Sequence, residues 1–524
     1  MSNESKSHMR QSDSLLEPSR RQLVGLLGGA ILASALAPGA HAQAKRGGIL
    51  KVVMPANPGS LDPLTGGQGT EHSFLFTMFD TLVAWDFQTL TAKPLLASDW
   101  TYPDPKTLVM NLRQGVTFHD GTKFDASAVK AHIDRARQDP ASAVRGDLTS
   151  IDSIEVPSDF QVVFHLKQPD SALPLIFSDR AGMISSPTAV TTAGAAYKRQ
   201  PVGTGPWKFA EWVDNDVVSV RRNESYWQDP VPLDGIDMKI IADPNTAARS
   251  VVAGENDFAH RLFPQQKVVA DRTARTQQIN FPTLVLYQVA FNLSRPALAD
   301  IRVRQAISHA VDKEAFNKVS QLGLGKVATT LLPPGYWAHD DSLDGFYPHD
   351  PEKARKLLAD AGFGGGLDLQ FYGYTDQASQ QRTELLMEQL RAVGIRLQLV
   401  AGVAADINAR FYGKGEGDLN LTTWTGRADP AQSFQLMYSK EGYTNPGHIA
   451  PPDDVLAALA EVRASADQDK RKVAFARLER LVLENALSVS LFFTPEIDVL
   501  SRKVKGYVPN ILGKPKFNDV YLEG

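Results

Sequence analysis

The sequence of 524 residues predicts an α/β protein made of more than one domain, and three observations support this fold class. The length exceeds what one hydrophobic core usually serves, so two or three domains are expected. Residues 281–313 change from an apolar, β-branched run to a helical pattern, which suits a crossing between two lobes. Residues 367–424 alternate between strand and helix patterns, which favours a mostly parallel sheet.

The first half of the chain reads mainly as strands. We expect strands or strand pairs at 49–54, 100–120, 160–166, 207–212, 217–222 and 238–241. Helices are expected at 72–82, after Asp125 as N-cap, and at 245–253. The loop 55–70 is rich in Gly and Pro, and residues 201–206 form a tight turn before the strand at 207.

The middle stretch carries the clearest switch from strand to helix. The apolar run that begins at Phe281 predicts a strand, and Pro296 is expected to close it. Asp300 is a good N-cap. The apolar residues after it recur at helical spacing: Ile301, Ala306, Ile307, Ala310 and Val311.

The second half predicts alternating elements and then helices. Asp350 followed by Pro351 marks a helix start. Strands are expected at 367–372, 395–400 and 419–424, with helices at 377–393 and 406–412 between them. Two helices, 453–465 and 468–485, precede a buried strand at 488–493, and the tail from Glu496 is expected to return to the first lobe.

Composition excludes several classes of function. The formal net charge of −4 argues against a general nucleic-acid binder and against a charge-driven membrane-surface role. The chain has no cysteine, which excludes disulfides, thiolate metal sites, a cysteine nucleophile and a lipid-modified cysteine anchor. The sequence holds no G-x-S-x-G, H-E-x-x-H or P-loop motif, so we predict no catalytic residues, no metal, no cofactor and no enzyme activity.

Residues 1–42 are predicted to be an export signal. An Arg-Arg pair at 20–21 precedes a modestly apolar run at 23–36, and a small-x-small cleavage site follows at 40–42. The run is shorter than the ~20 residues needed to span a bilayer. The pair resembles a twin-arginine motif; an ordinary secretory signal with an incidental arginine pair is the alternative. Both interpretations place the mature protein outside the cytoplasm, cleaved near Ala42.

Motifs along nearly the whole mature chain resemble, in order and spacing, the peptide/nickel class (family 5) of extracellular solute-binding proteins. The segment FNLSRPALADIRVRQAISHAVDK, starting at Phe291, resembles the crossover segment of that class. The other motifs are LDPL…FDTLV, VTFHDGTKFDASAVK, PVGTGPWKF, NESYW, VAGENDF, HDPEKARKLLADAGF and GRADP. Such proteins are the periplasmic ligand receptors of ABC importers.

The resemblance implies a two-lobed, hinged periplasmic-binding-protein fold of type II. Residues 43–293 plus 495–524 would form the first lobe, with an inserted subdomain at about 84–200 and the second lobe at 294–494. The two crossing segments of the hinge would lie near Asn292 and Thr494. The resemblance also implies a periplasmic protein that binds a small-molecule or peptide ligand and docks on permease subunits in the inner membrane; we expect a monomer.

The loop after the strand 419–424 is the first candidate ligand site, because ligands usually bind at the carboxyl ends of strands in α/β lobes. Trp424 offers a flat apolar surface, and Thr425 follows it. Arg427 can pair with a carboxylate or phosphate, and Asp429 can hold an ammonium, as an aspartate in this loop does in peptide-binding relatives. The alternative is that Asp429 caps the next helix and pairs with Arg427.

Two further loops are candidates. In the loop 65–72, we expect the side chains of Gln68 and His72 to contact the ligand. The same sequence is equally compatible with a turn that makes no ligand contact. Tyr374, which follows the strand 367–372, is also expected to contact the ligand. Arg145 could meet a ligand carboxylate but reads better as a surface residue, and Tyr287 reads better as a core aromatic residue.

Two motifs resemble binding sites but are not interpreted as such. Residues 323–328 mimic a dinucleotide fingerprint, but a helix precedes them where a strand is needed. The acidic and histidine residues at 339–350 could suggest a metal site, namely His339, Asp340, Asp341, Asp344, His349 and Asp350. Their loop is rich in Pro and Gly, and Asp350 already has a capping role, so we expect a solvated loop.

The favoured function is delivery of a short peptide, or a related amphoteric solute with a carboxylate, to an ABC importer. Non-peptide ligands on the same scaffold, such as a nickel chelate, an opine or an oligosaccharide, remain open. An exported hydrolase is a further alternative, which a turnover assay on peptides and esters would detect.

Overall fold

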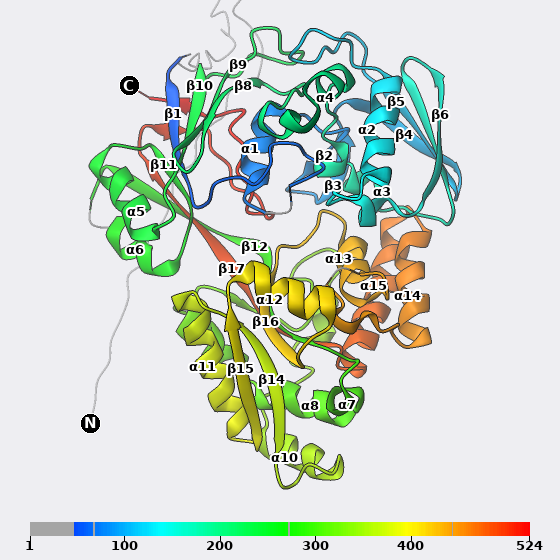
Figure 1. The fold of residues 1–524 in the computed structure, drawn as a ribbon, viewed down its shortest axis with the longest axis vertical. Helices are drawn as coiled ribbons and strands as arrows, with labels where there is room; N and C mark the ends of the chain where they lie inside the picture. The colour runs from blue at the N-terminus through cyan, green and yellow to red at the C-terminus, as the bar shows by residue number, and fades with distance from the viewer. Residues whose placement is uncertain (1–46, 67–68, 271–272, 443, 524) are drawn as a thin grey trace, which may run out of the picture. The chain divides into compact units, whose positions relative to one another are not determined.

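The computed structural model describes residues 47–66, 69–270, 273–442 and 444–523, so the predicted export signal lies outside the described residues. Most of the strands join one mixed sheet (Figure 1). Its order is β15 (Ile395–Gly402), β14 (Leu367–Tyr374), β16 (Leu419–Trp424), β12 (Thr276–Phe291), β17 (Ser488–Ser501), β11 (Phe258–Leu262), β1 (Ile49–Met54), β10 (Gly235–Ile240), β9 (Val217–Arg222) and β8 (Trp207–Val213), with β13 (Lys326–Val327) paired to β17.

Three neighbouring strands confirm the predicted β-α-β-α-β pattern. β14 runs parallel to both β15 and β16. α11 (Gln377–Arg391) connects β14 to β15 and packs on both. α12 (Ala404–Asn408) and a π-helical turn (Ala409–Gly413) connect β15 to β16. Because the three strands are parallel, their carboxyl ends share one edge, which is where a ligand is expected.

β12 and β17 are the long antiparallel strands at the centre of the sheet. Their pairing runs from Thr276 opposite Ser501 to Ala290 opposite Ser488. The ladder is interrupted between Pro282 and Leu286, where the Thr283 hydroxyl donates to the Thr494 carbonyl at 2.8 Å. The predicted crossing at Thr494 lies at this interruption, whereas Asn292 lies just after β12. The lobe bounds themselves stay a prediction.

β17 is longer than the predicted strand at 488–493. It continues to Ser501 without a break and pairs with β11 as well as β12. The tail therefore returns as part of a strand and not as a separate segment beginning at Glu496.

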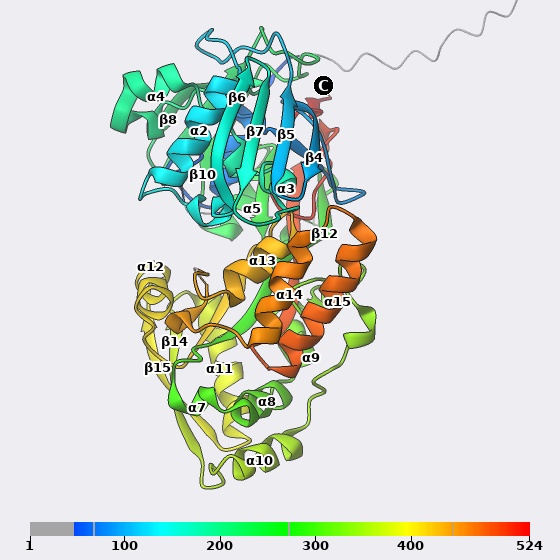
Figure 2. The same ribbon diagram turned by 90° about the vertical axis from the view of Figure 1, so that its right-hand side faces the viewer.

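A separate antiparallel sheet lies within the predicted inserted subdomain. Its order is β4 (Ala97–Asp104), β5 (Thr107–Leu112), β7 (Gln161–Leu166) and β6 (Ile151–Ser158). Helix α2 (Ala126–Gln138) packs on β6 and β7 (Figure 2). The Asp125 carboxylate accepts a hydrogen bond from the Ala128 amide, which confirms the predicted N-cap.

Helix α1 (Glu71–Met78) ends before the predicted boundary at 82. The tight turn at 201–206 docks on its end, and the Gly205 amide donates to the Met78 carbonyl at 3.0 Å. A Cβ atom on Gly205 would lie 2.5 Å from the Met78 carbonyl carbon, so only glycine allows this approach. This contact joins residues far apart in sequence, and local patterns do not reveal it.

The end of β12 also differs from the prediction. The strand stops at Phe291, and the Asn292 side chain forms a turn by accepting from the Ser294 amide at 3.1 Å. Pro296 does not end the strand but begins α7 (Pro296–Ala299), where its missing N–H costs nothing. Asp300 caps α8 (Ile301–Ala310) as predicted.

The other elements surround these sheets. Asp350 caps α10 (Pro351–Asp360) through the Lys353 amide, as expected. The remaining helices and strands are β2 (Val83–Asp86), β3 (Thr91–Pro94), α3 (Leu173–Ile176), α4 (Pro187–Ala193), α5 (Pro244–Ala253), α6 (Pro264–Ala270), α9 (Lys313–Gln321), α13 (Pro430–Tyr438), α14 (Asp453–Ala464), α15 (Gln468–Glu484), β18 (Val504–Lys505) and β19 (Tyr521–Leu522). Across the described ranges, no helix combines the length and apolar character needed to cross a membrane.

Candidate ligand-binding site

The loop between β16 and α13 places three predicted residues together. Trp424 is 7% exposed, and its indole N–H donates to the Ser433 hydroxyl at 3.1 Å. The Arg427 guanidinium lies over the Trp424 ring, 4.5 Å from its centroid, and Nη1 donates to Thr425 Oγ1 and to the Gly426 carbonyl. These contacts hold the cation in a fixed position.

Gly426 makes this loop possible. Its φ of +68° lies in the left-handed region, and a Cβ atom there would lie 2.4 Å from Leu284 Cβ on β12. A larger residue would therefore push the loop away from the strand and move Arg427 with it.

Asp429, predicted to contact ligand, lies on the wall of neither cavity described below. It is fully buried, its two carboxylate oxygens accept from Arg471 at 2.7 and 2.8 Å, and it caps α13 through the Ala431 amide. The capping alternative is confirmed, but the partner arginine is Arg471 of α15 and not Arg427. Because both oxygens already accept hydrogen bonds inside the core, Asp429 is not placed to hold the ammonium of a ligand.

A cavity of about 710 Å³ opens beside this loop, within the range of small-molecule sites. Its lining includes side chains of both charges, namely Arg145, Arg427, Asp147 and Glu441. Its polar and aromatic lining includes Gln288, Asn408, Tyr412, Thr422, Trp424 and Thr425. Arg145, which read better as a surface residue, is exposed and also lines this cavity.

A second, smaller cavity of about 100 Å³ adjoins the first. The lining residues that belong to both are Gly69, Ala143, Asp147, Thr425 and Arg427. His72, Asp179, Arg180 and Gln432 line only the smaller cavity. The two cavities thus form a larger and a smaller compartment on either side of Arg427.

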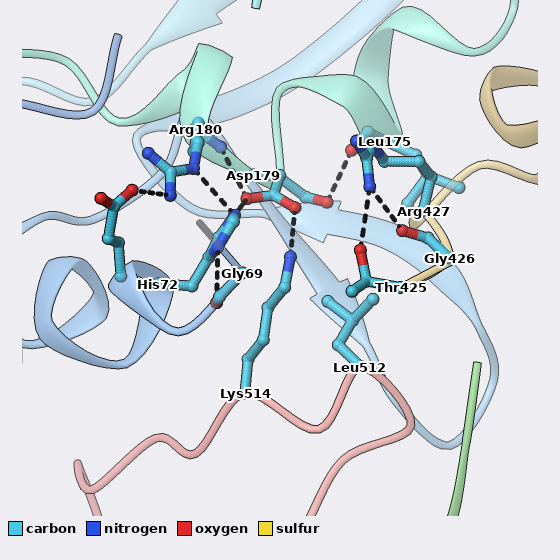
Figure 3. A network of polar contacts seen from close by, with 12 residues as sticks. Gly69, His72, Leu175, Asp179, Arg180, Thr425, Gly426, Arg427, Leu512 and Lys514 are labelled. Carbon is cyan, nitrogen blue, oxygen red and sulfur yellow. Dashed lines mark hydrogen bonds and ion pairs between the residues drawn. The ribbon is translucent and has the colours of Figure 1, made fainter. Parts of the chain in front are cut away.

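A buried polar network forms one wall of the smaller cavity (Figure 3). Asp179 Oδ1 lies 2.6 Å from His72 Nε2, and Asp179 Oδ2 lies 2.8 Å from Lys514 Nζ. Arg180 donates to Glu71 at 2.7 Å. The network joins α1, the turn at 179–182 and the C-terminal tail.

The network has a strong effect on its titratable groups. Burial lowers the pKa of His72 to about 3 and that of Lys514 to about 8. Burial alone would raise the pKa of Asp179, but His72 and Lys514 together hold it well below its usual value. Asp179 is therefore ionised at neutral pH and electrostatically compensated within the protein.

Asp147, on a short 3₁₀ turn (Arg145–Leu148), faces both cavities. Burial raises its pKa, while Arg427 and Gln432 act in the opposite direction. Neither Asp147 nor Arg427 forms an ion pair with any residue of the described ranges. No local pattern points to Asp147, Asp179 or Lys514, since each acquires its role from long-range contacts.

The remaining predicted residues are placed as follows. Gln68 lies outside the described residues. The Tyr374 hydroxyl lies 2.8 Å from Asn408 Oδ1 and 3.1 Å from Thr422 Oγ1. These partners line the larger cavity, but Tyr374 itself is not among its lining residues. Tyr287 packs against Phe492 with ring centroids 5.1 Å apart, as expected for a core aromatic residue.

The predicted solvated loop is confirmed for Asp341 and Asp344, which are exposed, but not for His339. His339 is buried, with Nδ1 3.1 Å from Glu479 of α15 and Nε2 3.2 Å from Asp344. The Thr330 hydroxyl and the Asp340 amide also donate to Glu479. The cluster therefore fastens the loop to α15, which gives it a structural role.

Fold and site together define a two-lobed protein with a cavity of mixed charge for a solute. The family described as bacterial extracellular solute-binding proteins, family 5, matches residues 91–445. The chain belongs to this family, which confirms the resemblance seen in the sequence.

Known relatives agree with this assignment. The glutathione-binding protein GsiB of Salmonella paratyphi A is 31% identical over 393 residues, which cover 73% of this chain and 76% of that protein. Among solved structures, the periplasmic binding protein DppA of Helicobacter pylori, in complex with the peptide STSA, gives a TM-score of 0.82 at 23% identity, covering 92% of this chain and 99% of that one. The binding protein AgaA of A. tumefaciens R10, in complex with agropinic acid, gives a TM-score of 0.81 at 24% identity. The match covers 91% of this chain and 99% of that one.

Proposed function

We propose that this protein is the periplasmic receptor that captures a short peptide, or a related amphoteric solute, and delivers it unaltered to the permease of an ABC importer. It would be exported by the segment 1–42, cleaved near Ala42, and act as a monomer. Sequence similarity to glutathione-binding relatives supports a peptide ligand.

The observation that carries this proposal is the mixed charge of the larger cavity. Arg427 and Arg145 can meet a carboxylate, while Asp147 and Glu441 can meet an ammonium. Polar groups that converge on a cavity fix the orientation of a ligand, and the Trp424 face adds contact area. A peptide carries both charges at its ends, so its chemistry matches this lining better than that of a neutral sugar.

Capture would use the interrupted pairing of β12 and β17 as a hinge. The two lobes would bend about Thr283–Val285 and Thr494, where the ladder is broken, so the first crossing would lie before the one predicted near Asn292. A ligand shifts such an equilibrium only by its higher affinity for the closed state. Closure around the solute would then present the form that the permease recognises.

The test is native mass spectrometry of the purified protein, followed by calorimetry with the solute it carries. A co-purified peptide, or micromolar affinity for short peptides, is the expected result. An opine, a sugar or a nickel chelate as the bound solute would replace the peptide assignment. Sustained product formation from peptides or esters would contradict the delivery of an unaltered solute.

A further inference from the structure

We propose that the smaller cavity binds an α-amino-acid head group, with a free ammonium and a free carboxylate on one carbon, while the larger cavity binds the rest of the solute. This inference rests on the function proposed above and narrows its ligand class. It predicts a solute with an unblocked amino-acid end, such as a γ-glutamyl peptide, in preference to one that separates the two charges.

The first argument is the size and position of the smaller cavity. Its volume of about 100 Å³ holds several waters, or one compact polar group, against about 710 Å³ in the larger cavity. Because both cavities are lined by Arg427, Asp147 and Thr425, a solute can place its head in one and its chain in the other.

The second argument is that most charges in the smaller cavity are already compensated. Asp179 is held by His72 and Lys514, and Arg180 is paired with Glu71. Figure 3 shows these contacts side by side, with Arg427 on the opposite side of the view. Since a compensated carboxylate gains little from a further cation, these groups shape the cavity and are not the primary contacts of the ligand.

The third argument is that one cation and one anion remain. In the described part of the chain, neither Arg427 nor Asp147 has an opposite charge within ion-pair distance, although the charge of Arg427 lowers the pKa of Asp147. Both hydrogen bonds recorded for the Arg427 guanidinium come from Nη1, so Nε and Nη2 can meet a carboxylate. The Asp147 carboxylate can accept from an ammonium, and Gln432 lies on the same wall.

A zwitterion satisfies both groups at once. A head group with only a carboxylate would engage the Arg427 charge that acts on Asp147 and bring no cation to Asp147, and a head group with only an ammonium would bring no carboxylate to Arg427. The zwitterion also brings no net charge into a cavity whose other charges already balance. The lining of the smaller cavity therefore matches a ligand in which an ammonium and a carboxylate are bonded to the same carbon.

The experiment is calorimetry with glutathione (γ-glutamyl-cysteinyl-glycine), its N-acetyl derivative and its α-glutamyl isomer. Glutathione should bind roughly tenfold or more tightly than the other two, as for one charge-assisted contact. Asp147→Asn should lower the affinity for glutathione by about the same factor and leave that for the N-acetyl derivative unchanged. Asp152→Asn, an exposed change on β6, is the matched control and should change neither affinity.

The outcomes separate this inference from the proposed function. If N-acetylation has no effect, or if Asp147→Asn weakens both peptides equally, the head-group assignment is wrong. If other short peptides bind and glutathione does not, the head-group assignment fails while peptide delivery stands; if no peptide binds, both fail. Arg427→Gln provides a second variant, since it should weaken both peptides, and thermal unfolding verifies that each variant folds.

Discussion

At the scale of single residues, Arg427 is the side chain on which ligand binding depends most. Its position over Trp424 is fixed, and it lines both cavities. We expect Arg427→Ala to weaken solute binding by ~1.5–3 kcal/mol, the range of a charge-assisted hydrogen bond. Calorimetry with the co-purified solute measures this change. Arg249→Ala, an exposed arginine on α5, should leave the affinity unchanged; equal affinity of the Arg427 variant would make its role structural.

Asp429 should behave in the opposite way. Its pair with Arg471 is buried, with side chains 0% and 8% exposed, so Asp429→Asn leaves an arginine charge without its partner. We expect a loss of about 3–5 kcal/mol in the free energy of unfolding, with little change in solute affinity. Urea denaturation and calorimetry on the same samples measure the two effects, with the exposed Asp453→Asn as control. Weaker binding at unchanged stability would restore Asp429 as a ligand contact.

At the scale of elements, His339 fastens the loop 328–350 to Glu479 of α15. Burial alone would lower the pKa of His339, but Glu479 and Asp344 raise it above its usual value of 6.5. A raised pKa in the folded state adds stability that is complete below pH 6.5 and is lost as the pH rises through the folded-state pKa. The contribution of this loop to the free energy of unfolding should therefore decline as the pH rises above 6.5.

This pH dependence can be measured by urea denaturation between about pH 6 and pH 9. The free energy of unfolding of the wild-type protein should fall with rising pH by more than that of His339→Gln, which cannot carry the charge. His448→Gln, a change at an exposed histidine outside this loop and α15, is the control and should follow the wild type. Parallel curves for the His339 variant and the wild type would show that His339 is neutral in the folded protein.

At the scale of the whole molecule, the sequence predicted those features that depend on neighbours along the chain. The parallel strands, the hairpin of β8 and β9 and the aspartate caps follow from local periodicity and capping chemistry. The site depends on contacts that no local pattern reveals. Asp179 meets Lys514 across 335 positions, and Asp429 pairs with Arg471, 42 positions away, although Arg427 is nearer in sequence.

Closure of the two lobes can be tested by a disulfide crosslink. Because the chain contains no cysteine, two introduced cysteines can pair only with each other. A Cβ atom on Gly69 would lie 3.6 Å from Thr425 Cγ2, so these positions join the predicted first and second lobes across the site. In the variant carrying Gly69→Cys and Thr425→Cys, a disulfide should form on oxidation and hold the lobes closed. Solute bound before oxidation should then be released many times more slowly, and reduction should restore the original rate.

Each single-cysteine variant is the control for the substitution itself. Unchanged release from the oxidised double variant would mean that the solute leaves without separation of Gly69 from Thr425, and hinge bending could not be the step that opens the site.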